Sequence, residues 1–330
     1  MEFSKSKLKN IMVIGTGGTI AGTGDAGKTL SYKSGQIEVD DLISEIPDLK
    51  SIANVTSNEL FSIDSCDITG RDWIHLANYI QEMADSGSID GFVITHGTDT
   101  LEETAFFLNL TVKTSKPIVI TGSMRPSTAM SPDGPFNIFQ AVALARSEES
   151  AGKGVLIAFS DAIYSARDVQ KINAFRVSAF SQRDLGCLGY IRDDKVYFYS
   201  SSTKKHTFNS EFDISKISEL PNVSIAPFYA GADPKILDYL RETSRGIILS
   251  GAGCGGCSTV WDKKIQEFMM SGFPIVRSSR IANGLITSEY VSQKGIFSNT
   301  LSPQKSRILL SLALTQTDNI DKVRSVFETY

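Results

Sequence analysis

The sequence predicts an α/β protein with a larger N-terminal domain, built on a doubly wound, mostly parallel sheet, and a smaller C-terminal α/β domain. Short apolar runs such as Gly91–Thr95 are continuous rather than alternating, which is typical of parallel strands buried on both faces. Helical periods lie between these runs, and that alternation builds a doubly wound sheet. After Tyr199 the sequence becomes polar before a second α/β set begins, which indicates a second domain.

The N-terminal elements follow from hydrophobic spacing. The first strand is predicted over Ile11–Ile14, directly before a glycine-rich stretch. Three more runs rich in valine and isoleucine and bounded by turn residues predict buried strands at Gly91–Thr95, Pro117–Thr121 and Gly154–Phe159. Apolar residues at i, i+4 and i+7 predict two helices between these strands, one with Leu101, Ala105 and Leu108 and the other with Ile138, Val142 and Ala145.

We expect an N-terminal catalytic domain over residues 1–199, a linker over 200–222 and a C-terminal domain over 223–330. The C-terminal strands and helices are predicted at Val223–Pro227, Pro234–Arg241, Gly246–Ser250, Thr259–Met270 and Pro274–Arg277. A closing helix begins at Ser302 and Pro303, which suit the N-cap and N1 positions.

The composition is that of a globular protein, with 41% hydrophobic and 21% charged residues among 330. A formal net charge of −4 without clustered basic residues argues against nucleic acid as a partner and favours a small molecule. No run approaches the roughly 18 apolar residues of a membrane span, so no membrane partner is expected. The N-terminus shows no secretory signal, which predicts a cytoplasmic protein, or a periplasmic one if a signal peptide has been removed.

Four cysteines in a chain of this size do not suggest a disulfide framework. Cys254 and Cys257 have the spacing of a metal or redox pair, but the sequence holds no second close pair and only three histidines. We therefore expect free thiols in a reducing compartment, and neither a metal nor a cofactor.

The glycine-rich stretch Gly15–Gly22 follows the first strand and carries the hydroxyls of Thr16 and Thr19. Glycine at this density allows positive φ angles and close approach of another group. Three interpretations stay open: a tight strand-to-helix turn, a phosphate-binding loop, and a loop that presents hydroxyls. Gly22–Thr29 matches both G-x-G-x-x-G and G-x-x-x-x-G-K-[ST], but it lacks a strand directly before it and a helical period after it.

A second informative stretch, Thr95–Glu103, begins where a buried strand ends. Thr100 and Glu103 have the spacing of a capping box, so Thr98 and Asp99 lie in the loop beyond the strand's carboxyl end. Ligands of open α/β sheets bind in that crevice. Asp99 is explained equally well as a helix cap. Two hydroxyl-bearing loops at the ends of two strands nevertheless favour a catalytic site.

A hydroxyl nucleophile needs a base. Histidine is nearly excluded, because His75 lies in a helical segment, His206 lies in the linker, and His96 is explained as well by packing in its loop. Lys171 follows the strand that ends near residue 160, through a loop at the same sheet end, and a desolvated lysine can act as a base. Tyr32 is the other candidate, although on residue type alone both are more often surface groups.

The residues taken together resemble the bacterial L-asparaginase family, in its type II or glutaminase-asparaginase group. The resemblance rests first on two specific threonine motifs, at residues 16–22 and 94–104. It continues over essentially the whole chain through segments at residues 122–126, 131–135, 212–216, 277–280 and 301–305.

This resemblance implies an amidohydrolase that converts L-asparagine to L-aspartate and ammonia. Thr19 matches the threonine that forms the acyl-enzyme, and Tyr32 matches the tyrosine on the mobile loop that activates it. Thr98, Asp99 and Lys171 match a second cluster that activates water or assists proton transfer. Covalent catalysis of this kind divides one difficult step into two.

The resemblance also implies how substrate is bound. Asp99 would hold the α-ammonium group, Ser65 the α-carboxylate, and the backbone carbonyl of Ser123 would contact the leaving amide. The implied substrate-binding residues are Gly18, Ser65, Cys66, Gly97, Thr98, Asp99 and Ser123. Backbone N–H groups in the glycine-rich loops would stabilise the oxyanion.

The implied assembly is a homotetramer, a dimer of dimers in which a partner's C-terminal domain completes each site. Glu289 aligns with a glutamate given by a neighbouring subunit when a short deletion is placed before it.

Two departures from the family pattern concern substrate recognition. Cys66 stands where the family usually has glutamine, and Cys254 lies where it usually has Gly-Asn-Gly-Asn, a position that reaches the substrate from a neighbouring subunit. A thiol is a weak hydrogen-bond partner. We therefore expect an intact catalytic centre with altered recognition of the α-ammonium and α-carboxylate groups.

The sequence leaves three alternative functions open. The same chemistry could act on L-glutamine or another small amide, as the two cysteines suggest. A non-catalytic amino-acid sensor on the same fold is disfavoured by the complete catalytic set. A nucleotide-binding protein built on Gly22–Thr29 comes third.

Overall fold

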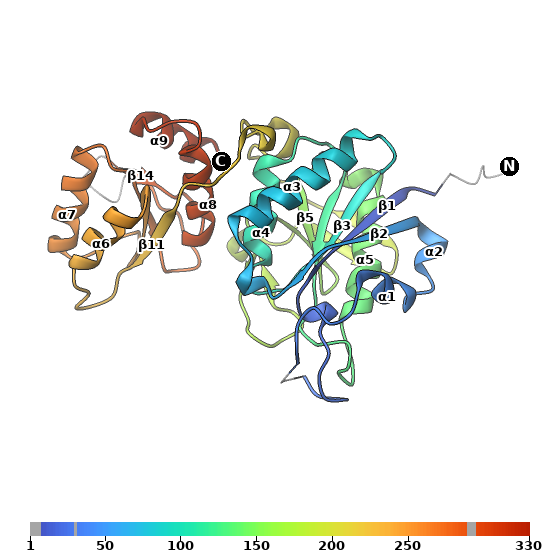
Figure 1. The fold of residues 1–330 in the computed structure, drawn as a ribbon. Helices are drawn as coiled ribbons and strands as arrows, with labels where there is room; N and C mark the ends of the chain where they lie inside the picture. Colours follow the sequence, from blue (N-terminus) through green and yellow to red (C-terminus); the bar gives the residue numbers. More distant parts are fainter. Residues whose placement is uncertain (1–7, 30–31, 289–294) are drawn as a thin grey trace. The chain divides into compact units, whose positions relative to one another are not determined.

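The computed structural model describes residues 8–29, 32–288 and 295–330, and it divides into two compact units, Met1–Ile214 and Ser215–Tyr330 (Figure 1). The division falls inside the stretch 200–222 that the sequence marks as a linker.

The N-terminal unit is built on an eight-stranded sheet in the order β10-β9-β6-β5-β4-β3-β1-β2. Its five parallel strands are β1 (Asn10–Gly17), β2 (Asn54–Ile63), β3 (Gly91–Thr95), β4 (Ile118–Thr121) and β5 (Val155–Phe159). Three antiparallel strands extend it: β6 (Ala162–Ser165), β9 (Gly189–Arg192) and β10 (Lys195–Phe198). The predicted mostly parallel sheet is confirmed. Because β2 and β3 lie on opposite sides of β1, the strand order reverses there, and such a point is where open α/β sheets bind ligands.

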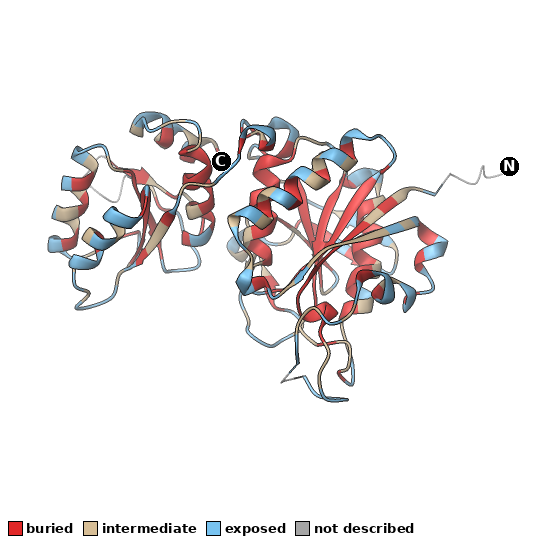
Figure 2. Cartoon of the chain, in the orientation of Figure 1, coloured by how far each residue is buried: buried red, intermediate tan, exposed pale blue. Residues whose placement is uncertain are grey.

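Helices cover both faces of this sheet. One face packs against α1 (Val39–Ser44), α2 (Leu49–Ile52) and α5 (Gly134–Arg146), and the other against α4 (Leu101–Thr111), which α3 (Gly70–Asp85) covers. Figure 2 shows the central strands buried and the outer faces of α1 and α3 exposed. Trp73 of α3 stacks on Phe107 of α4 with ring centroids 5.4 Å apart, and α4 is buried almost throughout. That burial explains why apolar residues of α4, such as Ala105, Phe106 and Leu108, are not confined to one face.

In its described residues, the C-terminal unit has a parallel sheet in the order β11-β12-β13-β14 and four α-helices. The strands are β11 (Val223–Pro227), β12 (Gly246–Gly251), β13 (Ile275–Ser279) and β14 (Ile296–Phe297), and the helices are α6 (Lys235–Thr243), α7 (Thr259–Met270), α8 (Pro303–Ala313) and α9 (Ile320–Thr329). The Ser302 hydroxyl accepts from the Lys305 N–H, so the predicted N-cap of α8 is confirmed. Across the described ranges of both units, every helix is too short or too polar to cross a bilayer.

One local expectation differs from the structure. The predicted capping box at Thr100 and Glu103 is wrong, because no side chain caps α4 there. The Thr100 hydroxyl donates instead to the Ser65 carbonyl at 2.7 Å, which ties two site loops together. The predicted linker over 200–222 contains the division between the units, and its first part packs on the N-terminal unit: Phe212 is fully buried, and the Ser210 hydroxyl donates to the Leu110 carbonyl at 2.5 Å.

Candidate active site

Four polar residues follow the carboxyl ends of four adjacent parallel strands. Thr19 follows β1, Ser65 follows β2, Thr98 follows β3 and Ser123 follows β4. Parallel strands end at the same sheet edge, so this order gathers the four loops around the point where the strand order reverses.

The glycines of these loops allow backbones to touch. Gly18 has φ 83°, and a Cβ placed on it would lie 2.3 Å from the Gly97 Cα. A Cβ on Gly97 would lie 2.7 Å from the Ser65 Cβ. Thr16 does not enter the site, because its hydroxyl donates to the Thr95 carbonyl at 2.8 Å and links β1 to β3.

The Thr19 hydroxyl is hydrogen-bonded to the Tyr32 hydroxyl at 2.7 Å. Thr19 begins a single 3₁₀ turn, Thr19–Ala21, and is almost buried. The backbones of Thr23 and Lys33 exchange two hydrogen bonds of 3.1 and 2.8 Å. This pairing folds the segment back so that the tyrosine ring lies over Gly22, where a Cβ would meet its Cδ2 at 2.9 Å.

Lys171 joins the second cluster. Its Nζ donates to the Thr98 hydroxyl at 2.9 Å and to Asp99 Oδ1 at 2.6 Å. Lys171 lies on a two-stranded ribbon of β7 (Gln170–Lys171) and β8 (Phe180–Ser181). The carboxylate of Glu102, on α4, accepts from the Lys171 backbone N–H at 2.5 Å and so fastens this ribbon beside the site.

Both clusters open into one cavity of about 300 Å³ in the N-terminal unit. It is lined by Thr19, Thr29, Tyr32, Thr98, Asp99, Met124, Arg125, Lys171, Ala174 and Phe175. The structure therefore brings together all five side chains that the sequence indicates as catalytic. Sequence reasoning missed Thr29, Met124, Arg125, Ala174 and Phe175 as site residues, although Met124 and Arg125 follow the carboxyl end of β4, where a site residue is expected.

Cys66 lies exposed at the edge of the Asp99 carboxylate, with its Sγ 3.9 Å from Oδ2. Burial, followed by the hydrogen bond and charge of Asp64 and the charge of Asp99, raises the pKa of the Cys66 thiol. The thiol therefore stays neutral and is a poor nucleophile. Ser65 beside it is buried.

His96 is fully buried and acts in the packing of the Thr98 loop. Its Nδ1 lies 2.8 Å from the Gly97 carbonyl, which can only accept, so this nitrogen carries the proton. Its Nε2 then accepts from the Thr104 hydroxyl at 2.9 Å, and that hydroxyl accepts from the Trp73 indole at 2.8 Å. Burial lowers the pKa of His96 to about 4. A neutral imidazole with both nitrogens bonded cannot serve as the catalytic base.

The turn after β4 is held by α5. Asp133 accepts the backbone N–H groups of Met124 at 3.0 Å and Arg125 at 2.9 Å. Asn137 donates to the Gly122 carbonyl at 2.9 Å, and the Ser123 hydroxyl donates to the Arg125 carbonyl at 2.8 Å. These bonds fix the direction in which the Ser123 backbone and the Arg125 side chain leave the turn.

The phosphate-loop interpretation of Gly22–Thr29 is wrong. The Gly24 N–H donates to the Thr128 hydroxyl at 3.0 Å and the Gly27 N–H donates to the Thr128 carbonyl at 2.8 Å. Amides that would cradle a phosphate are thus already bonded to a neighbouring loop.

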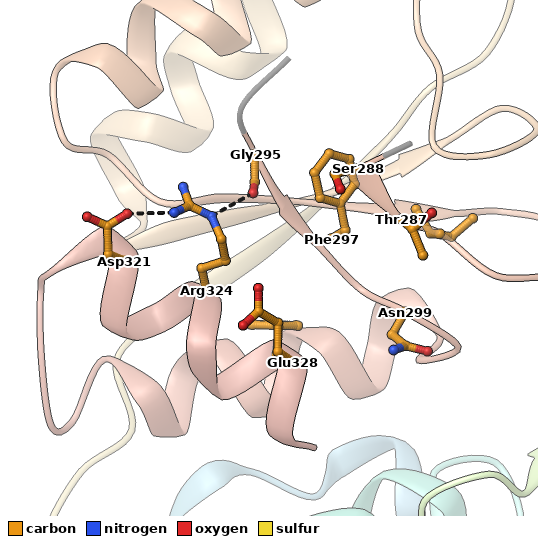
Figure 3. Close-up of a pocket in the computed structure, with 10 residues that line it drawn as sticks. Thr287, Ser288, Gly295, Phe297, Asn299, Asp321, Arg324 and Glu328 are labelled. Carbon is orange, nitrogen blue, oxygen red and sulfur yellow. Dashed lines mark hydrogen bonds and ion pairs between the residues drawn. The ribbon is translucent and has the colours of Figure 1, made fainter. Parts of the chain in front are cut away.

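The C-terminal unit has a separate cavity of about 550 Å³ between β14 and α9 (Figure 3). Arg324 on its wall is engaged by Asp321 at 2.5 Å and by the Gly295 carbonyl at 3.0 Å. Cys254 lies exposed in the turn after β12, and Glu289 falls outside the described residues. Over residues 8–29, 32–288 and 295–330, no group of three or more His, Cys, Asp or Glu side chains could hold a metal ion.

Comparison with known proteins gives matches over the full length. The family model described as "Asparaginase, N-terminal" matches residues 10–204, and the one described as "Glutaminase/Asparaginase C-terminal domain" matches residues 222–327. L-asparaginase 2 of Bacillus subtilis strain 168 is 42% identical over 99% of this chain and 88% of its own length. The glutaminase-asparaginase of Pseudomonas fluorescens biotype A is 41% identical over 99% of this chain and 92% of its own. The crystal structure of a probable cytoplasmic L-asparaginase from Campylobacter jejuni aligns with TM-score 0.94 and 42% identity, covering 98% of this chain and all of that one.

Proposed function

Because the chain belongs to the asparaginase family of amidohydrolases, we propose that it hydrolyses L-asparagine to L-aspartate and ammonia with Thr19 as nucleophile. One observation carries this proposal. The Thr19–Tyr32 pair and the Lys171–Thr98–Asp99 cluster face the same cavity, so a nucleophile and a second proton-handling group reach one substrate amide.

In the first half-reaction the Thr19 oxygen attacks the side-chain carbonyl carbon of the substrate. The Thr19 proton passes to the Tyr32 oxygen through the 2.7 Å hydrogen bond while the Tyr32 hydroxyl proton passes to the leaving nitrogen, so the phenol stays neutral. The C–N bond breaks, ammonia leaves, and an ester to Thr19 remains.

The oxyanion of this step needs backbone donors, each typically worth about 3 kcal/mol. The Gly18 N–H already donates to the Ile63 carbonyl at 3.1 Å. In this proposal the donors are therefore the N–H groups of Thr19 and Thr98, and Gly18 and Gly97 contribute by letting the two turns approach.

In the second half-reaction water attacks the ester carbonyl, and the Lys171–Thr98–Asp99 cluster orients it and receives its proton. The C–O bond to Thr19 then breaks, the Thr19 oxygen takes a proton back from the site, and aspartate leaves. Asp99 has two tasks in this proposal. Its Oδ1 is bonded to Lys171, which leaves Oδ2 directed to the Cys66 side, where the α-ammonium of the substrate would bind. Ser65 would bind the α-carboxylate.

The test is ammonia release by two single variants. Thr19→Ala should abolish turnover because it removes the nucleophile, and Thr98→Val should do so because it removes the hydroxyl between Lys171 and the substrate. Ammonia release at the wild-type rate in either variant would refute the role given to that threonine. Tight aspartate binding without any ammonia release by the wild type would instead support a non-catalytic sensor.

A second candidate is the same chemistry on L-glutamine or another small amide. Cys66 favours it, because a thiol at 3.9 Å from Asp99 replaces the amide that usually helps to hold the amino-acid end. Measuring kcat/KM for a panel of asparagine, glutamine and simple amides distinguishes the two candidates.

We further propose a cytoplasmic homotetramer, a dimer of dimers. All four cysteines are free thiols, which supports a reducing compartment. Cell fractionation tests the compartment, and light scattering during gel filtration tests the assembly.

A further inference from the structure

The catalytic cavity extends beyond the groups that the hydrolysis of a primary amide uses. Ser65 and Cys66, at the amino-acid end of the proposed substrate, do not line it, whereas Met124 and Arg125 do. These two residues directly follow Ser123, whose carbonyl is proposed to contact the leaving nitrogen. The additional space is therefore on the leaving-group side.

The lining of this space includes groups that ammonia does not need. The whole cavity measures about 300 Å³ and also receives the aspartyl part of the substrate, so the additional room is indicated by Met124, Arg125 and Phe175 on its wall. A larger group attached to the amide nitrogen would fill it.

Arg125 gives this side a positive charge. The residue is half-buried, its Nη1 donates to the Ser131 carbonyl at 2.9 Å, and within the described part of the chain no carboxylate forms an ion pair with it. Asp133 binds only the backbone N–H of Arg125, which fixes the residue without neutralising it. A partly desolvated guanidinium of this kind matches a carboxylate in geometry and charge.

Phe175 gives the same side an apolar surface. Its side chain lines the cavity, yet the residue is 74% exposed. Asn173 Oδ1 accepts the N–H groups of Phe175 at 3.0 Å and Arg176 at 2.9 Å, so a side-chain-bonded turn fixes the Phe175 backbone beside the cavity. An exposed aromatic ring on a formed turn can pack against an apolar group of a ligand.

We propose that the enzyme also cleaves β-aspartyl dipeptides with an apolar second residue, with Arg125 binding the carboxylate of the leaving amino acid and Phe175 packing against its side chain. This inference rests on the proposed function, because it uses the same nucleophile. The Thr19 oxygen attacks the β-carbonyl carbon, the C–N bond to the second residue breaks, and the proton from Thr19 goes to the departing amine. Water then hydrolyses the ester, so one dipeptide and one water give aspartate and a free amino acid.

The first experiment compares substrates on the wild-type protein. β-Aspartyl-phenylalanine should release phenylalanine, and its C-terminal amide, which lacks the carboxylate, should react about 10- to 100-fold more slowly in kcat/KM, the usual range for losing a charged hydrogen bond. Equal rates for the two compounds, or no phenylalanine release by protein that hydrolyses asparagine, would overturn the proposal. Protein that releases no ammonia from asparagine would instead refute the proposed function.

The second experiment uses variants and reads the ratio of dipeptide to asparagine kcat/KM. Arg125→Gln should lower this ratio at least tenfold, and Phe175→Ala should lower it for β-aspartyl-phenylalanine but not for β-aspartyl-glycine. Arg176→Gln is the matched control, because this exposed arginine does not line the cavity, and its ratio should equal that of the wild type. An unchanged ratio in Arg125→Gln would contradict the carboxylate-binding role. If that variant does not fold, the comparison of the dipeptide with its amide probes the same contact from the ligand side.

Discussion

Gly18 combines two constraints, a backbone conformation with φ 83° and ψ −173° and a missing Cβ that would lie 2.3 Å from Gly97. Because the atom it would meet is backbone, no side-chain rotation relieves the contact. We predict that Gly18→Ala lowers the free energy of unfolding by about 3 kcal/mol or more, from strain and overpacking together, and abolishes activity by separating the two turns. Urea denaturation and ammonia release measure the two effects.

Gly27→Ala is the matched control. Gly27 also has a positive φ, 78°, but nothing lies within 4 Å of its missing Cβ. Only the conformational strain remains, about 1 kcal/mol. Equal losses of stability in the two variants would show that contact with Gly97 does not matter.

His96 makes stability depend on pH. Burial lowers its pKa to about 4 in the folded protein, against about 6.5 in the unfolded chain. The unfolded state therefore binds the proton first, and stability is fully present above pH 6.5 and falls as the pH is lowered towards 4. The loss is at most about 1.4 kcal/mol per pH unit and about 3 kcal/mol in total.

His96→Gln removes this titration and can keep a donor towards Gly97. We predict that the difference in unfolding free energy between wild type and variant shrinks as the pH falls from 6.5 to 4, as measured by urea denaturation at each pH. A difference that stays constant over that range would contradict the assignment of His96 as a buried neutral group.

We expect mutation of Cys66 to change the affinity for the substrate. We predict that Cys66→Gln lowers KM for asparagine about fivefold with little change in kcat, because one neutral hydrogen bond contributes about 1 kcal/mol. Cys66→Ala should keep KM near the wild-type value, since the thiol is a weak partner. Steady-state kinetics on the three proteins checks this, and a higher KM in the glutamine variant would show that the thiol is already adapted to the ligand.

Single residues also show what the sequence could and could not predict. Thr19 and Thr98 were predictable because each follows a buried strand at its carboxyl end. The bonding partner of His96 was not, because Trp73 and Thr104 come from two helices whose packing has no local signature. Phe175 and Arg125 lie 50 residues apart in the sequence and line the same cavity only in the folded protein.

At the scale of elements, the ribbon of β7 and β8 carries Lys171 into the site, and the Glu102 carboxylate on α4 holds it through the Lys171 N–H. We predict that Glu102→Ala lowers stability by about 1 to 3 kcal/mol, because a donor loses its buried partner, and lowers kcat more than it raises KM. Glu102→Gln keeps an acceptor oxygen and should retain most of the stability and most of kcat. Thermal unfolding and steady-state kinetics of the two variants check this prediction. Equal effects of the alanine and glutamine substitutions would show that the contact between the Glu102 oxygen and the Lys171 N–H does not position Lys171.

The predictability of the elements depended on burial. β3, β4 and β5 are buried at every position, and their continuous apolar sequences were found within a residue of their bounds. β2 was missed because it is an edge strand with exposed and half-buried positions and a polar sequence. α1 and α2 have six and four residues, too few to show a helical period.

At the scale of the whole molecule, we propose that a neighbouring subunit completes each site. Within the described N-terminal unit, the Tyr32 hydroxyl is hydrogen-bonded to Thr19. The family resemblance implies that a neighbouring copy adds one more carboxylate to the site, that of Glu289. If each site takes its threonine from one subunit and its glutamate from another, two inactive variants can complement each other.

We predict that Thr19→Ala and Glu289→Ala, each with little activity alone, regain about a quarter of wild-type activity when co-expressed. Random pairing makes half of the dimers mixed, and in each of these one of the two sites has both residues intact. Co-expression of Thr19→Ala with Thr98→Val is the control and should restore nothing, because both residues belong to the same N-terminal unit. If Glu289 served its own subunit, every site in a mixed dimer would lack one group, and the first pair would stay as inactive as the control.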